Sequence, residues 1–122
     1  VKASLNNKKY TIIGYKGKQV RDNIHSQDLV RCFWEFYKKP SCGEVYNTGG
    51  GRLSNCSIIE ALNIVEKIAK IKISKKILRQ NRVGDHIWYI SSMKRFKKKY
   101  PKWKQKYSTY RIIKELVQEF SL

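Results

Sequence analysis

The chain has few acidic residues, few prolines and few cysteines, and it contains no long apolar run. Its 122 residues include 9 Asp and Glu against 27 Lys and Arg, with only 2 Pro, 3 Cys and 2 His. No apolar segment reaches the roughly 20 residues that a membrane-spanning helix needs, and the N-terminus lacks the charged, apolar and small-residue order of a secretory signal. We therefore expect a soluble, cytoplasmic protein with no membrane partner.

The cysteines and histidines do not form a metal-binding or disulfide pattern. Cys32, Cys42 and Cys56 are odd in number and include no Cys-x-x-Cys pair, and His25 and His86 stand at no metal-ligand spacing. This pattern argues against structural zinc and against a disulfide framework. Neutral thiols are typical of a reducing compartment, and we predict no metal site.

The basic composition has two readings. A formal charge of +18 and a pI near 10.0 are typical of nucleic-acid-binding proteins. Lys outnumbers Arg by 20 to 7, however, as AT-rich codon usage can produce, and the lysine runs are scattered along the chain at 8–9, 38–39, 75–76 and 97–99. We interpret the charge as a solvated surface and expect no nucleic-acid partner, with a small RNA- or DNA-binding module as the alternative.

Apolar spacing and turn residues predict an α/β fold of short strands alternating with helices, forming one unit over residues 1–122. The 41% hydrophobic content is enough for a modest core. Because the first residue is Val1, we expect the chain to begin within a longer protein. The expected helices are the tail of one over 1–7, then 26–39, 57–69, one between Ser91-Ser92 and Pro101, and one from Ser108 or Thr109; the expected strands are 10–14, 19–24, 44–47 and 73–78.

The strand expected at 44–47 is followed by a glycine loop and a helix. That order predicts parallel pairing with strands that this chain lacks. Gly49-x-Gly51-x-x-Ser54 in the loop resembles a dinucleotide fingerprint, but the third glycine and a later acidic residue are missing. We interpret this loop as a tight structural turn or the edge of a ligand site.

Tyr100-x-x-x-Lys104 has the spacing of a dehydrogenase catalytic pair, in which the lysine lowers the pKa of the tyrosine. Pro101 directly follows the tyrosine, so the two side chains need not share a helical face. We therefore assign no catalytic role to this pair. Trp88, Trp103 and Tyr107 are interpreted as core or interface aromatics.

Two arginines are the best candidates for a binding site. Arg21 ends an extended run just ahead of a helix start, and Arg82 lies in a loop beside Gly84 and Asp85. An arginine followed by an aspartate is most often part of a weak surface ion pair. Planar bidentate donors are nevertheless what phosphate oxygens require, and two such arginines could clamp one pyrophosphate, with Asp85 and His86 ordering the second loop.

Four ordered strings, at residues 13–26, 43–52, 54–57 and 81–88, carry a family resemblance. The sequence resembles the C-terminal part of the extended short-chain dehydrogenase/reductases, which are NAD-dependent nucleotide-sugar epimerases and dehydratases with a Rossmann-type fold. It looks closest to the CDP-paratose 2-epimerase branch. The resemblance covers nearly the whole chain.

The resemblance implies roles for matching positions. Arg21 and Arg82 look like the family's pyrophosphate-binding pair, Asn47 like a contact to the ribose or phosphate, and Ile13 to Tyr15 like a wall beside the base of a CDP-hexose. We also count Asp85 as a substrate-binding residue.

The family's N-terminal half, with its NAD loop and catalytic tyrosine and lysine, is absent. We therefore expect no catalytic residue, no NAD bound by this chain and no activity alone. Self-association through the open edge at 44–47, or a role as an assembly contact only, is left open.

Overall fold

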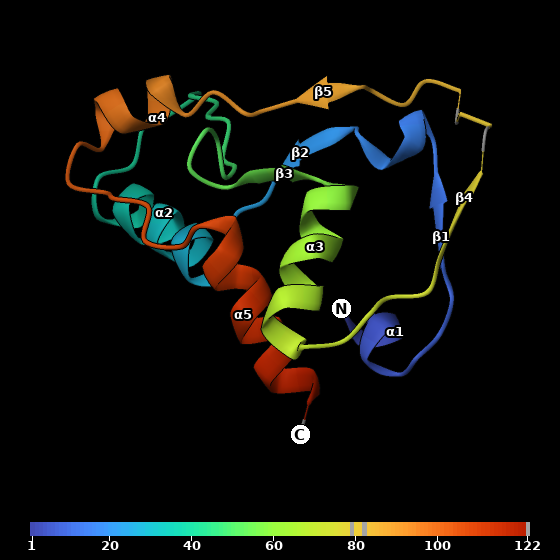
Figure 1. Cartoon of the computed structure of the whole chain (residues 1–122). Coiled ribbons are helices and arrows are strands. Elements are labelled where there is room, and N and C mark those ends of the chain that lie inside the picture. Colours follow the sequence, from blue (N-terminus) through green and yellow to red (C-terminus); the bar gives the residue numbers. More distant parts are fainter. Residues whose placement is uncertain (79, 82, 122) are drawn as a thin grey trace.

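The computed structural model describes residues 1–78, 80–81 and 83–121, and it confirms the α/β fold (Figure 1). Helices α3 and α5 lie side by side in the middle, with β1 and β4 on one side and α2 with α4 on the other. The elements are α1 (Lys2–Leu5), β1 (Tyr10–Ile13), the short 3₁₀ helix η1 (Tyr15–Gly17), β2 (Val20–Asp22), α2 (Ser26–Lys38), β3 (Asn55–Ser57), α3 (Ile58–Ala69), β4 (Lys75–Leu78), β5 (Trp88–Tyr89), α4 (Lys94–Lys99) and α5 (Thr109–Phe120).

The strands form two small sheets. β1 pairs with β4 in parallel, and the exposed Lys75 and Lys76 confirm that β4 is an edge strand. In the second sheet β2 lies between antiparallel β3 and parallel β5. The sequence did not predict β3 and β5, because strands of three and two residues are too short to show alternation.

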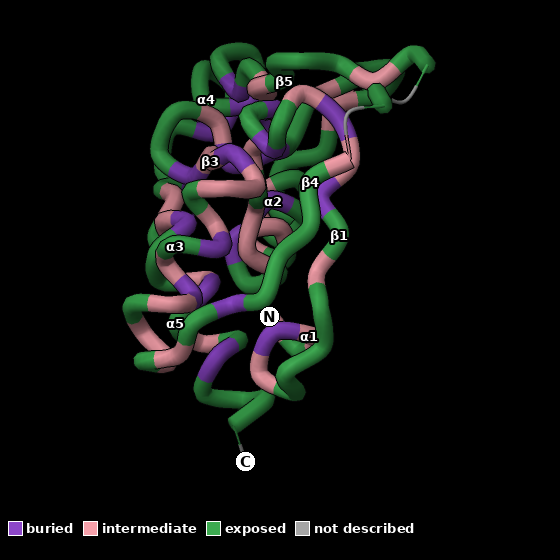
Figure 2. Tube along the Cα trace, turned by 45° about the vertical axis from the view of Figure 1, so that its right-hand side comes forward, coloured by how far each residue is buried: buried purple, intermediate pink, exposed green. Residues whose placement is uncertain are grey.

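The core has two parts. The first lies between α3, α5 and strand β1. Its buried residues are Ile12, Leu62, Val65, Ile73, Ile113 and Val117. The second joins α2 to the segment around α4 through Cys32, Met93, Phe96, Tyr100 and Trp103. Figure 2 shows buried positions alternating with exposed ones along α3 and α5, as expected for amphipathic helices.

Helix caps were predicted with mixed success. Ser57 caps α3 through the expected capping box with Glu60, and Ser108 caps α5 by accepting from the Arg111 N–H. The prediction for α2 was wrong by one residue, since His25 Nδ1 accepts from the Gln27 N–H at 3.1 Å. No side chain caps α4, because Met93 and not Ser91 or Ser92 precedes its first turn.

The strand predicted at 44–47 does not form, so this prediction was wrong. Its β-forming residues need hydrogen bonds to a neighbouring strand, and no backbone hydrogen bond to Glu44–Asn47 occurs among the described residues. The Tyr46 ring packs edge-on against Phe96 and Tyr100, whereas Val45 is 73% exposed. Pairing with strands outside this chain stays a prediction.

Over the described part of the chain, no helix has the combined length and apolar character required to cross a membrane. The three cysteines are free thiols: Cys32 is buried, Cys56 is half-buried and Cys42 is exposed.

Candidate functional site

Arg21 lies on the central strand β2, opposite Cys56 on β3 and beside Tyr89 on β5. Its Nη2 donates to Asp85 Oδ1 at 2.5 Å, and its Nη1 donates to the Val20 carbonyl at 2.8 Å. The ion pair therefore joins residues 64 positions apart, and the carboxylate comes from Asp85 rather than from the neighbouring Asp22. Two predicted site residues are in direct contact.

Arg21 and Asp85 line an open hollow of about 370 Å³. This volume lies within the roughly 300–1,000 Å³ of small-molecule sites. The polar lining residues come from β2 and the residues beside it, from β3 and from the Asp85 loop, whereas the lining residues from α3 and α5 are largely apolar. The other lining residues are Gln19, Asn23, Cys56, Ser57, Ile58, Ala61, Thr109, Ile112, Ile113 and Leu116.

Gln19 adds an acceptor that the sequence analysis missed. Its side chain is 6% exposed, and Nε2 donates to the Ile13 carbonyl at 2.9 Å. Oε1 is buried and has no hydrogen-bond partner among the described residues. A buried carbonyl oxygen without a partner is costly, so Oε1 is suited to a hydroxyl or amine of a ligand. The signal was available, because Gln19 stands two residues before Arg21 and so shares its face of an extended run.

Tyr15 and Ile13 connect to the same site. The Tyr15 N–H donates to Asn81 Oδ1 at 2.8 Å, and its hydroxyl donates to the Asp85 carbonyl at 3.4 Å. Tyr15 thereby connects η1 to the loop that contains Asp85. Ile13 is connected to the site indirectly, because its carbonyl accepts from Gln19. Tyr15 also lines a second hollow of about 670 Å³ with Lys16, Ile77, Leu78 and Asn81.

Asn47, another predicted residue, does not line this hollow. Asn47 is exposed in an irregular segment, and no hydrogen bond or ion pair among the described residues connects it to Arg21. Arg82 lies outside the described residues. The arginine pair therefore stays a prediction.

Two titratable groups on β3 and α3, Cys56 and Glu60, have shifted pKa values. Burial, and then the charge of Glu60, raise the pKa of the Cys56 thiol, which keeps it neutral. Glu60 accepts hydrogen bonds from the Ser57 N–H and Oγ, both at 2.7 Å, and these lower the pKa of the Glu60 carboxyl.

The glycine loop is closed by the protein itself. A Cβ added to Gly50 would lie 2.1 Å from the Asn23 carbonyl oxygen and 2.2 Å from that of Ser54. Asp22 accepts from the Gly51 N–H at 2.9 Å and from the Ser91 N–H at 3.1 Å, so this carboxylate holds the loop. The backbone is therefore closely packed at Gly50, as a structural turn requires. Gly51 and Arg52 line an open hollow of about 950 Å³, so the alternative that the loop is the edge of a ligand site stays a prediction.

Trp103, Tyr107 and Tyr100 each contact other parts of the fold. Tyr100 is buried and its hydroxyl donates to the Lys39 carbonyl at 3.0 Å. Trp103 is buried and donates to the Asp28 carbonyl at 3.1 Å, while Tyr107 stacks on His25. Trp88 is 65% exposed, so it does not belong to the core.

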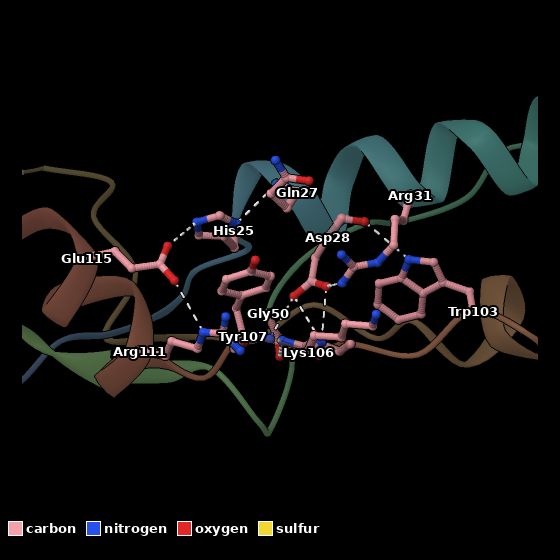
Figure 3. A network of polar contacts seen from close by, with 11 residues as sticks. His25, Gln27, Asp28, Arg31, Gly50, Trp103, Lys106, Tyr107, Arg111 and Glu115 are labelled. Carbon is pink, nitrogen blue, oxygen red and sulfur yellow. Dashed lines mark hydrogen bonds and ion pairs between the residues drawn. The ribbon is translucent and has the colours of Figure 1, made fainter.

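A buried carboxylate near the start of α2 holds the backbone at residues 106–107 (Figure 3). Asp28 is fully buried and accepts from the Lys106 N–H at 3.0 and 3.2 Å and from the Tyr107 N–H at 3.0 Å. The Arg31 guanidinium forms an ion pair with the same carboxylate. Gln105 donates to the Gly50 carbonyl at 2.9 Å, which extends the network to the glycine loop.

The second half of the network reaches α5. The His25 ring stacks on Tyr107 with centroids 3.8 Å apart, and the Arg111 guanidinium lies 4.2 Å from the Tyr107 ring centre. Glu115 joins His25 at 3.0 Å and Arg111 at 3.2 Å. The start of α2, five residues after Arg21, is thus fixed to both the 103–107 segment and α5 (Figure 3).

Comparisons with known proteins identify the fold. No protein-family model matches the sequence. CDP-paratose 2-epimerase of Salmonella typhi is 33% identical over 67 residues, which is 53% of this chain and 20% of that protein. UDP-glucuronic acid 4-epimerase of Bacillus cereus, solved with UDP-glucuronic acid and NAD, superposes with a TM-score of 0.84 at 22% identity, covering 98% of this chain and 37% of the other.

Two further solved structures agree. dTDP-glucose 4,6-dehydratase of Bacillus anthracis, in complex with NAD, gives a TM-score of 0.80 at 24% identity, covering 98% of this chain and 36% of that one. UDP-glucose 4-epimerase of Thermotoga maritima, solved with UDP-glucose, gives 0.79 at 24% identity, with 98% and 37% covered. The chain has the fold of one part of the nucleotide-sugar epimerases and dehydratases. The resemblance predicted from the four motifs is confirmed, and the chain spans little more than a third of these epimerase structures.

Proposed function

We propose that the chain is the nucleotide-sugar-binding part of an NAD-dependent nucleotide-sugar epimerase or dehydratase. The observation that carries the proposal is the hollow of Arg21 and Asp85, which has one polar and one apolar wall and lies in an epimerase fold. A guanidinium on a rigid strand suits a pyrophosphate, and an apolar wall suits the flat parts of a base and sugar.

In this proposal the residues have separate tasks. Arg21 turns from Asp85 toward the pyrophosphate, and the released Asp85 carboxylate accepts from hydroxyl groups of the ligand. Gln19 Oε1 accepts a further ligand donor. Ile13 and Tyr15 wall the base, and Asn47 and Arg82 reach the ribose or phosphate, as the family resemblance implies.

NAD would supply reversible hydride transfer at a sugar carbon. We propose that it is held by a part of the fold that this chain does not contain, because the closed loop around Gly50 does not fit a dinucleotide. This chain alone would bind the substrate without catalysing the reaction. The relatives' chains are almost three times as long as the matched region, which supports this division.

The exposed apolar face of α2 also supports the proposal that another part of the enzyme packs against this chain. Val30, Phe33, Trp34 and Tyr37 recur at helical spacing and are 60, 61, 57 and 74% exposed. An apolar stripe of this kind is normally buried against another element. The unpaired segment 44–47 follows this helix in the chain. We propose that the nucleotide-binding part of the enzyme covers α2 and pairs with 44–47, and that self-association through this edge is the alternative.

The similarity to the Salmonella typhi enzyme favours a CDP-hexose over other nucleotide sugars. We also propose that the enzyme is cytoplasmic. Its proposed substrates, nucleotide sugars, are charged and do not cross membranes unaided, so we expect the enzyme in the compartment that holds them.

Isothermal titration calorimetry with CDP-glucose and UDP-glucose tests the proposal. We expect saturable binding, tighter for CDP-glucose, that Arg21→Gln weakens by about 10- to 100-fold, since a charge-assisted hydrogen bond contributes about 1.5–3 kcal/mol. Arg52→Gln is the matched control, because Arg52 is exposed and does not line the hollow. Equal affinities for the two variants would contradict the proposal.

A further inference from the structure

The segment 94–106, here called the basic ridge, concentrates positive charge on one surface. Lys or Arg occupies eight of its 13 positions, with no Asp or Glu, and all eight side chains are exposed. Among the described residues only Arg95 of these eight has an ion pair, with Glu44. The charge of the ridge is therefore almost unneutralised by the protein.

The fold brings a second lysine run to the ridge. Lys38 and Lys39, at the end of α2, line a hollow of about 350 Å³ together with Lys99, Lys102 and Glu35, and Glu35 forms an ion pair with Lys38. These two lysine runs, predicted to be scattered, therefore lie beside one hollow in the folded chain. Lys39, Lys99 and Lys102 have no ion pair among the described residues. Like charges repel within a Debye length of about 8 Å, so an anion bound in this hollow would stabilise these three lysines.

The ridge is held in a fixed shape. Its three aromatic residues, Phe96, Tyr100 and Trp103, are each 3% exposed in the second core cluster. The Lys106 N–H donates a hydrogen bond to the Asp28 carboxylate, and the Tyr100 hydroxyl donates one to the Lys39 carbonyl. Most long runs of like charge are disordered, whereas here the backbone that carries the lysines is anchored at several points.

An aromatic side chain lies beside these cations. A hollow of about 950 Å³ is lined by Arg52, Lys94 and Lys97, with Trp88 at its wall, and no acidic residue is among the described residues that line it. Trp88 is 65% exposed. Sites that bind single-stranded nucleic acid combine two elements. Cations follow the phosphate backbone, and an exposed aromatic ring stacks on a base.

We propose that the basic ridge binds the sugar–phosphate backbone of single-stranded nucleic acid, with one base stacked on Trp88. This surface shares no lining residue with the hollow of Arg21 and Asp85, so it is a second site. An anionic membrane fits less well, because the aromatic side chains of the ridge are buried and cannot insert between lipids.

The test is fluorescence anisotropy of the whole chain with labelled oligo-dT at several salt concentrations. The ridge variant is Lys94→Gln/Lys97→Gln/Lys99→Gln, and the matched control is Lys72→Gln/Lys75→Gln/Lys76→Gln. The control removes the same charge from exposed positions in and before β4. Thermal unfolding of both variants checks that they fold.

We expect the ridge variant to bind at least about 10-fold more weakly at low salt and the control to change by less than about 3-fold. Each lost phosphate contact lowers the salt slope by about 0.7, so the ridge variant should lose about 2 in slope. Trp88→Ala should weaken binding about 10-fold with the slope unchanged.

Three outcomes would overturn the proposal. Equal losses in the ridge and control variants would mean that net charge alone is responsible. Absence of oligo-dT binding at low salt would exclude the site. Binding to vesicles containing phosphatidylserine without binding to oligo-dT would assign the ridge to a lipid surface instead.

Discussion

Removing the Asp28 carboxylate is the sharpest test of what holds the site in place. The side chain is fully buried and accepts from two backbone N–H groups and from Arg31. Asp28→Ala leaves the Lys106 and Tyr107 N–H groups without an acceptor, at about 1–3 kcal/mol each.

Solvent reduces this cost, because Lys106 is exposed and the Arg31 side chain is 30% exposed. We therefore expect a loss of about 2–4 kcal/mol in the free energy of unfolding, a large part of the roughly 5–15 kcal/mol available to a small domain. At about 4 °C per kcal/mol, Tm should fall by about 8–16 °C.

Urea unfolding followed by circular dichroism measures this loss. Glu35→Ala is the matched control, since Glu35 forms an ion pair with Lys38 on the same helix and its removal should cost less than about 1 kcal/mol. Hydrogen exchange should show faster exchange at residues 103–107 in Asp28→Ala. If Asp28→Ala and Glu35→Ala have the same stability, the network does not hold the 103–107 segment and the reasoning is refuted.

Two further predictions concern titration. Hydrogen bonds from Ser57 lower the pKa of Glu60 below its ordinary value, so the stability that Glu60 contributes is present above the ordinary pKa and is lost as pH falls through the lowered pKa. Between about pH 6 and about pH 3, urea unfolding should show a larger loss for the wild type than for Glu60→Gln, and equal losses would contradict the capping box. Burial, and then the charge of Asp28, raise the pKa of Cys32 to about 11. Iodoacetamide at about pH 8 should therefore modify the exposed Cys42 well before Cys32, as mass spectrometry of digests can show, and the reverse order would mean that Cys32 is not buried.

Helices were more predictable from the sequence than strands. α3 and α5 each carry an apolar stripe at helical spacing and a serine cap, and these local signals are enough to place them. β3 and β5 exist only because β2 pairs with both, so no local signal marks them. At 44–47 the sequence has β-forming residues but the described residues supply no partner strand, which is why a local prediction failed there.

The candidate site was predictable in chemistry and not in detail. The residue type and position of Arg21 indicated phosphate binding, but its ion pair spans 64 positions, and nothing local to Arg21 identifies Asp85 as the partner. The buried Oε1 of Gln19 is likewise a product of packing, since the amide is held by the Ile13 carbonyl. The basic ridge shows the same limit, because only the folded chain brings Lys38 and Lys39 beside Lys99.

The measurement that tests the central claim most directly is a titration of ¹⁵N-labelled chain with CDP-glucose, followed by two-dimensional NMR of the backbone amides. If the hollow of Arg21 and Asp85 binds the nucleotide sugar, the amides of Arg21, Asn23, Cys56 and Asp85 should shift together and saturate. Shifts confined to residues 94–106, or no saturable shifts, would contradict the proposal that this chain carries the nucleotide-sugar site.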